Sequence, residues 1–250
     1  MATPDLWQTI ATPASAEGVR AVVSKQLRRS AASSDAALSI PLEGRSRTSS
    51  LVEPLRFKRL FDLTFAAFLL LAMAPLFAVV AIAIGLDSPG QIFYRADRLG
   101  RNGRRFRCFK FRTMVIDAEE QQQRLLHLNE RDGVLFKVAD DPRVTRVGRV
   151  LRKYSLDELP QFFNVLRGEM SVVGPRPPVA TEVRLYGINH LRRLSVLPGV
   201  TGLWQTQARH DPSFESYVSL DLAYIDNWTV GLDLKIIAQT VGVVLEGNGI

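Results

Sequence analysis

Two adjacent carboxylates, Asp157 and Glu158, lie at a predicted helix start, and Arg176 follows a short way along the chain in a turn flanked by prolines. Carboxylates can hold a metal ion on a phosphate, and a planar guanidinium binds phosphate oxygens in pairs. Two upstream features would bring such a site to a lipid surface, namely the apolar run 63–86 and the cation-rich segment 95–112. Together these features predict phosphate chemistry at a membrane surface.

A purely structural role for the two acids is also consistent with the sequence. Ser155 and Glu158 have the spacing of a capping box, and acidic residues stabilise the first turn of a helix. Pro160 argues against a cap at Ser155, because proline is favoured at the first helical position and would then lie several residues inside. A helix that begins near Leu159 instead leaves Asp157 and Glu158 at its N-terminus, where backbone donors attract phosphate.

Composition and charge limit the classes of protein to consider. The chain has 250 residues, enough for one sizeable core with appendages, and its net charge is +7. The surplus cations gather in one segment with only Asp97 to oppose them: Arg95, Arg98, Arg101, Arg104, Arg105, Arg107, Lys110 and Arg112. Such a block suits nucleic acid, anionic lipid headgroups or a phosphorylated substrate. The single cysteine, Cys108, excludes an internal disulfide and indicates a reducing compartment.

The composition divides the chain into three parts. Residues 1–54 form a polar tail rich in Ala, Ser, Thr and Pro, which is predicted to be mostly disordered and lacks the continuous apolar core of a secretory signal. Residues 55–90 are predicted to form a re-entrant membrane helix. Residues 91–250 are predicted to form a cytoplasmic catalytic domain.

The apolar run 63–86 carries no charged residue and, at about 1.5 Å per residue, is long enough for the roughly 30 Å hydrocarbon core of a bilayer. Pro75 lies near its middle, where it removes a backbone donor and crowds the carbonyl of Leu71. Cations flank the run on both sides, which places both ends in the cytoplasm. These observations predict a helix that breaks at Pro75, dips into the bilayer and returns. An ordinary kinked transmembrane helix and a buried core helix are the alternatives.

A β-hairpin is predicted after the membrane helix. Gln91–Tyr94 and Arg105–Arg112 are β-prone, and Asn102-Gly103 between them is a tight-turn dipeptide. Because side chains alternate along a strand, Lys110 and Arg112 project from one face and could clamp a diphosphate. A strand that faces solvent or lipid headgroups would place the same cations without a substrate.

The rest of the chain reads as mainly helical. Residues 144–154 predict a basic amphipathic helix, which next to a membrane segment would lie against lipid headgroups. Helices are also predicted over 217–225 and 232–245, and a glycine-containing loop over 198–204. The predicted fold class is α+β and mainly helical: a monotopic membrane protein with a re-entrant helix, amphipathic interfacial helices and a small β-hairpin.

Five blocks of sequence, in order and at characteristic spacing from about Leu55 to the C-terminus, resemble the bacterial sugar transferases, the monotopic polyprenyl-phosphate phosphoglycosyl transferases. The blocks are Lys58–Asp62, Phe109–Met114, Leu151–Gln161, Gly168–Pro177 and Pro198–Gly202. The chain departs from the family pattern in two places. Ala74-Pro75 stands where the family commonly has Ser-Pro, and a polar tail stands where larger relatives carry a multi-span membrane domain.

The resemblance implies a reaction and roles for individual residues. Such enzymes move a sugar 1-phosphate from a nucleoside diphosphate sugar to undecaprenyl phosphate on the cytoplasmic face of the plasma membrane. In this chain Asp157 would attack the phosphorus and form a phosphosugar-aspartyl intermediate, and Glu158 would bind Mg²⁺. Arg152 and Arg176 would lie beside the phosphates, and Asp221 matches a position that often holds an acid near the active site. An exposed helix acid is the alternative for Asp221.

The partners implied are a nucleoside diphosphate sugar, undecaprenyl phosphate and membrane lipids, with no nucleic acid and with homo-oligomerisation left open. The donor is predicted to be UDP-glucose or UDP-galactose, used to initiate exopolysaccharide or other surface glycan synthesis. Two other hypotheses stay open from the sequence. A catalytically idle membrane scaffold would retain the anchor and the basic helices, and a nucleic-acid-binding protein would account for the basic block alone.

Overall fold

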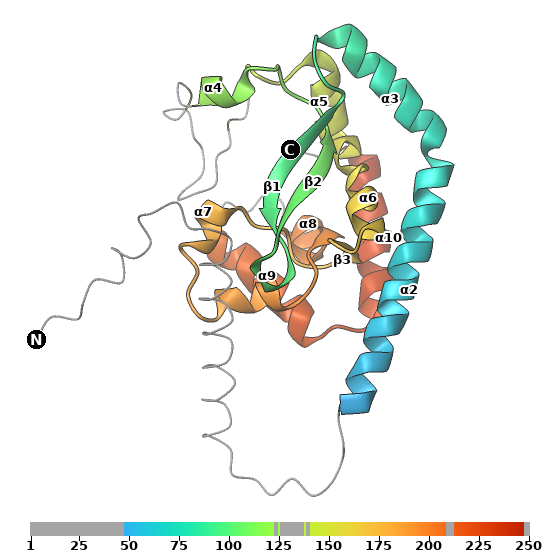
Figure 1. The fold of residues 1–250 in the computed structure, drawn as a ribbon, viewed down its shortest axis with the longest axis vertical. Helices are drawn as coiled ribbons and strands as arrows, with labels where there is room; N and C mark the ends of the chain where they lie inside the picture. The colour runs from blue at the N-terminus through green and yellow to red at the C-terminus, as the bar shows by residue number, and fades with distance from the viewer. Residues whose placement is uncertain (1–47, 123–124, 126–137, 139–140, 209–212, 248–250) are drawn as a thin grey trace, which may run out of the picture.

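The computed structural model describes residues 48–122, 125, 138, 141–208 and 213–247 (Figure 1). Most of the predicted tail, 1–54, lies outside these residues, although the first helix, α2 (Thr48–Ala72), already begins inside it. The described part is mainly helical, with one small antiparallel hairpin and one small parallel pair of strands. The predicted mainly helical fold with a hairpin is therefore confirmed.

The apolar run folds as two helices that meet at an angle. After α2 the chain breaks at Met73, and α3 (Ala74–Asp87) begins with Pro75 in its first turn. Proline suits this position because its missing N–H would have no intrahelical partner there, whereas a continuous helix would need that N–H for the carbonyl of Leu71. The two helices lie along one side of the molecule (Figure 1) and are bent by 60°.

The length and composition of the helices bear on whether one of them could cross a membrane. Within the described residues no single helix is both long and apolar enough to cross a bilayer, but the bent pair Arg56–Ala72 and Ala74–Asp87 satisfies both criteria when taken together. The predicted break at Pro75 is thus present.

The predicted hairpin is present but its first strand is displaced. Strand β1 (Phe93–Leu99) pairs antiparallel with β2 (Arg105–Phe111), and a short 3₁₀ turn with Asn102 at φ 59° and Gly103 at φ 69° joins them. The first strand was predicted at Gln91–Tyr94, and it instead runs on to Leu99. Cross-strand pairing explains the difference, because Ala96 opposite Cys108 and Leu99 opposite Arg105 extend the ladder. The charged residues of this segment give it no clear strand pattern in the sequence.

Short helices connect the remaining parts. They are α4 (Ala118–Gln122), α5 (Arg146–Lys153), the 3₁₀ helix η3 (Leu156–Glu158), α6 (Gln161–Leu166), α7 (Ala180–Val183), the 3₁₀ helix η4 (His190–Ser195), α8 (Leu203–Gln207), α9 (Phe214–Asp226) and α10 (Val230–Glu246). The helices predicted over 144–154, 217–225 and 232–245 correspond to α5, α9 and α10. All three are confirmed.

The segment 198–204, predicted as a loop, contains a strand. Strand β4 (Gly199–Thr201) pairs in parallel with β3 (Ser171–Val173). A Cβ on Gly199 would lie only 2.1 Å from the backbone nitrogen of Gly174, so glycine is required for the two chains to come this close. Three-residue strands far apart in the sequence leave no periodic signal, which is why this pair was missed.

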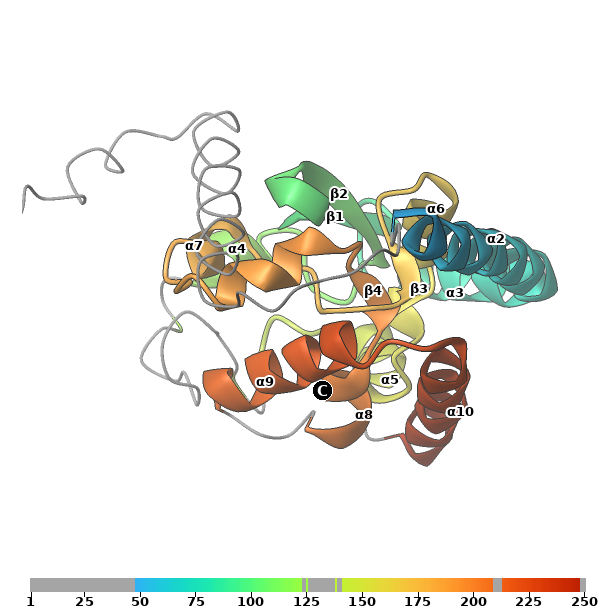
Figure 2. The same ribbon diagram turned by 90° about the horizontal axis from the view of Figure 1, so that it is seen from below.

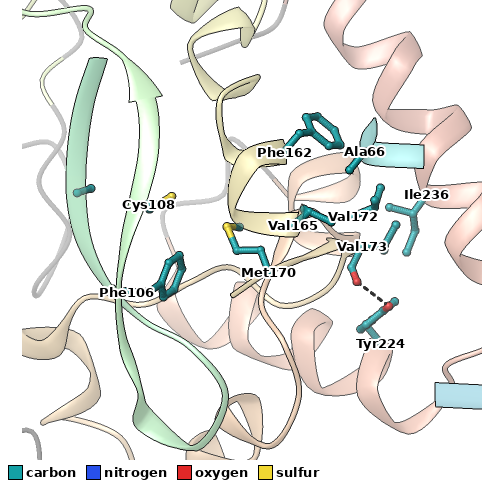
Figure 3. Close-up of a cluster of buried hydrophobic side chains, with 11 residues drawn as sticks. Ala66, Phe106, Cys108, Phe162, Val165, Met170, Val172, Val173, Tyr224 and Ile236 are labelled. Atoms are coloured by element: carbon teal, nitrogen blue, oxygen red, sulfur yellow. Dashed lines mark hydrogen bonds between the residues drawn. The ribbon is translucent and has the colours of Figure 1, made fainter. Parts of the chain in front are cut away.

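The main core joins helix α2 of the bent pair to the rest of the molecule. Figure 3 shows apolar side chains from α2, α6, β3 and α10 packed together, with the Tyr224 hydroxyl donating to the carbonyl of Val173 at 3.0 Å. The fully or nearly fully buried members include Ala66, Val165, Met170, Val172, Val173 and Ile236. Seen from below, β3 lies between α2 and α10 (Figure 2). Helix α2 is therefore part of the core rather than a separable anchor.

Polar contacts fasten α2 to this core. Asp62 is 1% exposed and accepts hydrogen bonds from the Ser171 hydroxyl and the Val172 backbone, both at 3.0 Å. One turn earlier, the Lys58 ammonium lies 2.6 Å from a carboxylate oxygen of Asp233 on α10. The block Lys58–Asp62 thus connects α2 to β3 and α10, which explains why these residue types occur in it.

One buried amide joins α6 to the hairpin. The Asn164 side chain accepts a hydrogen bond from the Phe109 backbone at 2.9 Å and donates to the carbonyl of Arg107 at 2.7 Å and to Glu169 at 2.6 Å. These contacts position β2 beside the start of α6. These contacts therefore fix the position of the hairpin relative to α6 and to the preceding segment, which carries the two acids.

Gly148 allows α5 to pack directly against the backbone of Thr113, which follows β2. A Cβ added at Gly148 would lie 2.1 Å from the Thr113 carbonyl oxygen. We expect Gly148→Ala to destabilise the protein by on the order of 1–3 kcal/mol, because backbone atoms must move to relieve the overlap. Gly242→Ala on α10 is the matched control, with nothing within 4 Å of the added carbon. The measurement is the Tm of both variants, and an unchanged Tm for Gly148→Ala would contradict this packing.

Candidate active site

A cleft of about 670 Å³ opens between the hairpin, the 3₁₀ helix η3 and the turn that holds Arg176. Six of the residues singled out from the sequence line it: Lys110, Arg112, Arg152, Asp157, Glu158 and Arg176. Asp221 does not line it. The fold therefore brings the two acids and all four predicted phosphate-binding cations to one cavity, although these residues come from separate segments of the sequence.

The two acids lie on η3, between α5 and α6. Ser155 precedes them in the left-handed region at φ 53°, and its side chain makes no capping hydrogen bond. The capping-box interpretation is therefore wrong. Helix α6 begins only at Gln161, after Pro160, as expected if the acids precede a helix rather than cap it at Ser155. A left-handed residue followed by a 3₁₀ turn directs the two acids into the cleft.

Asp157 is the more deeply buried acid, with 8% of its surface exposed. The Lys110 ammonium lies 2.7 Å from a Glu158 oxygen and 3.9 Å from an Asp157 oxygen. Burial raises the pKa of Asp157 to about 6, although the charge of Lys110 acts in the opposite direction. Burial also acts to lower the pKa of Lys110, but the attraction of Glu158 and Asp157 outweighs it and the pKa rises. Lys110 is thus a permanent cation beside the dyad.

Two of the predicted phosphate-binding arginines have structural partners within the cleft wall. The Nε of Arg152 donates to the Thr113 hydroxyl at 3.0 Å, and its charge favours the ionised form of Asp157. The guanidinium of Arg112 donates to the carbonyl of Ser88 at 2.7 Å and to the carbonyl of Pro89. Arg112 therefore fastens the end of α3 to the hairpin, a role that the sequence did not indicate.

Arg176 lies at the other side of the cleft on a charged support. Its guanidinium is 3.6 Å from a Glu182 oxygen and 5.6 Å from the ring centroid of Trp204. Glu182 is fully buried and also lies 3.2 Å from the equally buried Arg193. Arg193 in turn donates to the backbone carbonyl of Arg176 at 3.2 Å. Both the side chain and the backbone of Arg176 are thus held from behind.

Asp221 belongs to this support. It is 1% exposed and pairs with Arg193 at 2.7 Å, so the alternative of an exposed helix acid is wrong. Burial raises the pKa of Asp221 to about 6, against the opposing effects of Arg193 and of a hydrogen bond from the backbone N–H of Arg176. Asp221 therefore acts on the cleft through Arg176, which it helps to position.

Sequence reasoning missed other residues in the cleft wall, notably Arg98, Trp204 and Gln205. Arg98 could have been found from the strand register, which places it on the same face of the hairpin as Cys108 and Lys110. The first strand was predicted to end at Tyr94, so Arg98 was not assigned to a strand face. Trp204 is the last residue of the segment predicted as a loop, and Gln205 follows it.

Metal binding would depend on the dyad. The described residues contain no group of three or more His, Cys, Asp or Glu side chains arranged to hold a metal. Asp157 and Glu158 supply two adjacent carboxylates beside the cleft. Mg²⁺ often takes only one or two carboxylates and completes its shell with substrate phosphates and water. The two carboxylates therefore fit a magnesium ion whose remaining ligands come from a phosphorylated substrate and water.

Comparison with known proteins shows the family of the chain. The sequence model of the family described as bacterial sugar transferase matches residues 54–247. The galactosyl transferase CpsE of Streptococcus agalactiae serotype III is 45% identical over 77% of this chain, and the exopolysaccharide production protein ExoY of Rhizobium meliloti is 43% identical over 77%. The undecaprenyl-phosphate glucose phosphotransferase of Komagataeibacter xylinus is 43% identical over 74%. The chain belongs to the bacterial sugar transferase family.

The relatives differ in how much of their length this chain matches. The matched region spans 87% of ExoY, but only 43% of CpsE and 35% of the K. xylinus phosphotransferase. The matched region contains every predicted site residue, since it runs from residue 54 to residue 247 in the family comparison. The shared part is thus the bent helix pair together with the domain that holds the cleft.

If Asp157 is the nucleophile that the resemblance to the family implies, its raised pKa predicts how the rate of transfer depends on pH. Only the ionised carboxylate can attack phosphorus, and its fraction falls about tenfold per pH unit below the pKa. We expect the initial rate at saturating substrate to rise from pH 5 to about pH 7 and then to level. Lys110→Gln should move the rise to higher pH, because Lys110 lowers the pKa of Asp157. A flat profile in a protein that stays folded by circular dichroism would contradict this role.

Proposed function

We propose that the protein transfers a sugar 1-phosphate from a nucleoside diphosphate sugar to undecaprenyl phosphate. The observation that carries the proposal is the buried Asp157, set between Lys110 and Arg152 in a cleft lined by further arginines. Such surroundings suit a carboxylate that must approach a negatively charged diphosphate. Family membership and relatives named for sugar transfer to undecaprenyl phosphate support it.

The first half of the proposed reaction uses Asp157 as the nucleophile. A carboxylate oxygen of Asp157 forms a bond to the sugar-bearing phosphorus, and the bond from that phosphorus to the bridging oxygen breaks. The bridging oxygen keeps the electron pair and leaves on the nucleoside monophosphate. Lys110, held by Glu158 at 2.7 Å, neutralises charge at the point where the two anions meet.

The second half returns the enzyme to its starting state. A phosphate oxygen of undecaprenyl phosphate attacks the same phosphorus, and the bond to Asp157 breaks, which releases the lipid diphosphate sugar and restores the carboxylate. Arg152 and Arg176 bind phosphate oxygens in both halves. Mg²⁺, held by Glu158 together with substrate phosphate oxygens, would supply further neutralisation of phosphate charge.

The bent helix pair is proposed to be re-entrant, with both ends on the cytoplasmic face of the plasma membrane. Its outward side chains are strongly apolar and 63% to 83% exposed: Phe68, Leu71, Val79, Ile82 and Leu86. Val150 on α5 and Phe163 on α6 add exposed apolar surface on helices that adjoin the pair. A surface of this kind needs lipid to cover it. It would deliver the lipid substrate to a cleft that opens beside the end of α3.

The donor is proposed to be a UDP-hexose for exopolysaccharide or other surface glycan synthesis. The names of CpsE and of the K. xylinus protein specify galactosyl and glucose transfer, which supports a hexose but does not choose between the two. A catalytically idle membrane scaffold is the alternative. The buried Asp157 disfavours it, since a scaffold has no need for a desolvated carboxylate beside a cluster of cations.

The covalent mechanism predicts a half-reaction without lipid. Incubation of the protein with UDP-glucose or UDP-galactose and Mg²⁺ should release up to one equivalent of UMP and leave the phosphosugar on Asp157, and the full reaction should show ping-pong kinetics. Asp157→Asn should abolish both events, because an amide is a poor nucleophile at phosphorus. The measurements are UMP release by chromatography and mass spectrometry of the peptide that contains Asp157.

The matched control for this experiment is Asp97→Asn, an equivalent change at an exposed position of the hairpin. It should retain both UMP release and the label. Sequential kinetics without a label, or an active Asp157→Asn protein, would exclude the covalent mechanism. Folded protein with no turnover for any nucleotide sugar would favour the scaffold.

The re-entrant topology predicts the accessibility of both ends of the helix pair. The native Cys108 is buried and would first be replaced by alanine. Cysteines then introduced at Arg56 and Pro89, both exposed positions, should resist a membrane-impermeant thiol reagent in intact cells and react after permeabilisation. Labelling of one end from outside intact cells would establish a true membrane span.

A further inference from the structure

Arg98 is a cation of the cleft wall for which the described residues supply no ion-pair or hydrogen-bond partner. It lies on β1, lines the cleft and is half-buried. Across the described ranges, no carboxylate lies within 4.0 Å of its guanidinium and the side chain forms no hydrogen bond. The other cations in the wall differ in this respect, since Lys110 pairs with Glu158 and Arg143 pairs with Asp141. A desolvated guanidinium without a partner is costly unless a ligand completes the site.

The surroundings of Arg98 contain more positive than negative charge. Burial lowers the pKa of Arg98, and the nearby charge of Arg176 lowers it further. Glu182 acts in the opposite direction, but this carboxylate also serves Arg176 and Arg193. With Asp221 included, two carboxylates among the residues that the structure describes face the three guanidinium groups of Arg98, Arg176 and Arg193, so these residues leave one positive charge uncompensated beside the cleft. The site therefore favours a bound anion.

The position of Arg98 relative to the dyad identifies which anion. On one face of the hairpin, Tyr94 opposite Lys110 is followed by Ala96 opposite Cys108 and then by Arg98. The buried thiol of Cys108 feels the charges of Lys110, Arg98 and Arg176, so it lies between the dyad end of the cleft and the Arg98 end. An anion bound by Arg98 and the nearby Arg176 would thus lie on the same face of the hairpin as Lys110, on the side of the cleft away from α3.

We propose that Arg98, together with Arg176, binds the phosphate group that departs with the nucleoside. The inference rests on the proposed function and names the residue that stabilises its leaving group. When the bond between the sugar-bearing phosphorus and the bridging oxygen breaks, that oxygen takes the electron pair, and the departing phosphate gains one negative charge. Two guanidinium groups placed there stabilise this charge more strongly in the transition state than in the bound substrate.

The test compares Arg98→Gln, Arg98→Lys and the control Arg105→Gln, an exposed arginine on the opposite face of the same hairpin. Equilibrium binding of UMP to the full-length protein in detergent is measured by calorimetry. We expect Arg98→Gln to weaken UMP binding about tenfold or more, as for loss of one charge-assisted hydrogen bond. Arg98→Lys should retain part of the affinity, because it keeps the charge without the planar fork. Arg105→Gln should bind as the unsubstituted protein does.

The two half-reactions give a second readout that a purely structural role would not produce. Arg98→Gln should slow UMP release from UDP-hexose about tenfold or more. Discharge of the already labelled protein by undecaprenyl phosphate should stay within about twofold of normal, since no leaving nucleotide takes part in it. Equal slowing of both halves would indicate a general defect and overturn the assignment.

The outcomes separate this inference from the proposed function. Unchanged UMP binding in Arg98→Gln, or an equal loss in Arg105→Gln, overturns the assignment of Arg98 even if the protein is an active transferase. UMP binding that depends on Arg98, in a protein that never releases UMP from a nucleotide sugar, supports the nucleotide-phosphate site and rejects the proposed reaction. Absence of UMP binding to the unsubstituted protein overturns the inference as well.

Discussion

The site depends on keeping a carboxylate buried and ionisable among fixed cations. Burial raises the pKa of Asp157, and Lys110 and Arg152 act against that rise. Each of these cations is itself held, Lys110 by Glu158 and Arg152 by the Thr113 hydroxyl. A buried charge without such partners would be neutralised or would destabilise the fold. The hairpin, the 3₁₀ turn and α5 are therefore arranged around one electrostatic requirement, and the left-handed Ser155 is part of that arrangement.

The same requirement accounts for the way the apolar helices join the domain. Lys58 and Asp62 bind α2 to β3 and α10, whereas Arg112 binds the end of α3 to the hairpin. Asp87, at the end of α3, accepts a hydrogen bond from the Val147 backbone at 2.9 Å, at the start of α5. The end of α3 is thus tied to elements that border the cleft, and α2 is tied to the core through β3 and α10. The depth of the cleft relative to the apolar surface is set by these contacts.

Local patterns predicted local features well. Hydrophobicity and Pro75 predicted the broken helix, the Asn102-Gly103 dipeptide predicted the hairpin, and α5, α9 and α10 followed from periodicity. Features that depend on long-range contacts were missed. The parallel pair of β3 and β4 relies on a close approach of Gly199 to Gly174, and Asp221 is buried only because Arg193 and Arg176 meet it there. Arg98 was overlooked because its face of the strand is defined by its partner strand and not by its own sequence.

The contacts of Asn164 have a consequence for how copies of this chain behave when crowded. A two-stranded hairpin has two free edges, each able to recruit a strand from another molecule and so begin aggregation. The Asn164 amide occupies the outward N–H of Phe109 and the outward carbonyl of Arg107, as a neighbouring strand would. On the opposite edge, the backbone N–H of Leu99 donates to the carbonyl of Pro178 at 2.9 Å. One side chain and one carbonyl thus occupy part of each edge of a sheet too small to be protected by more strands.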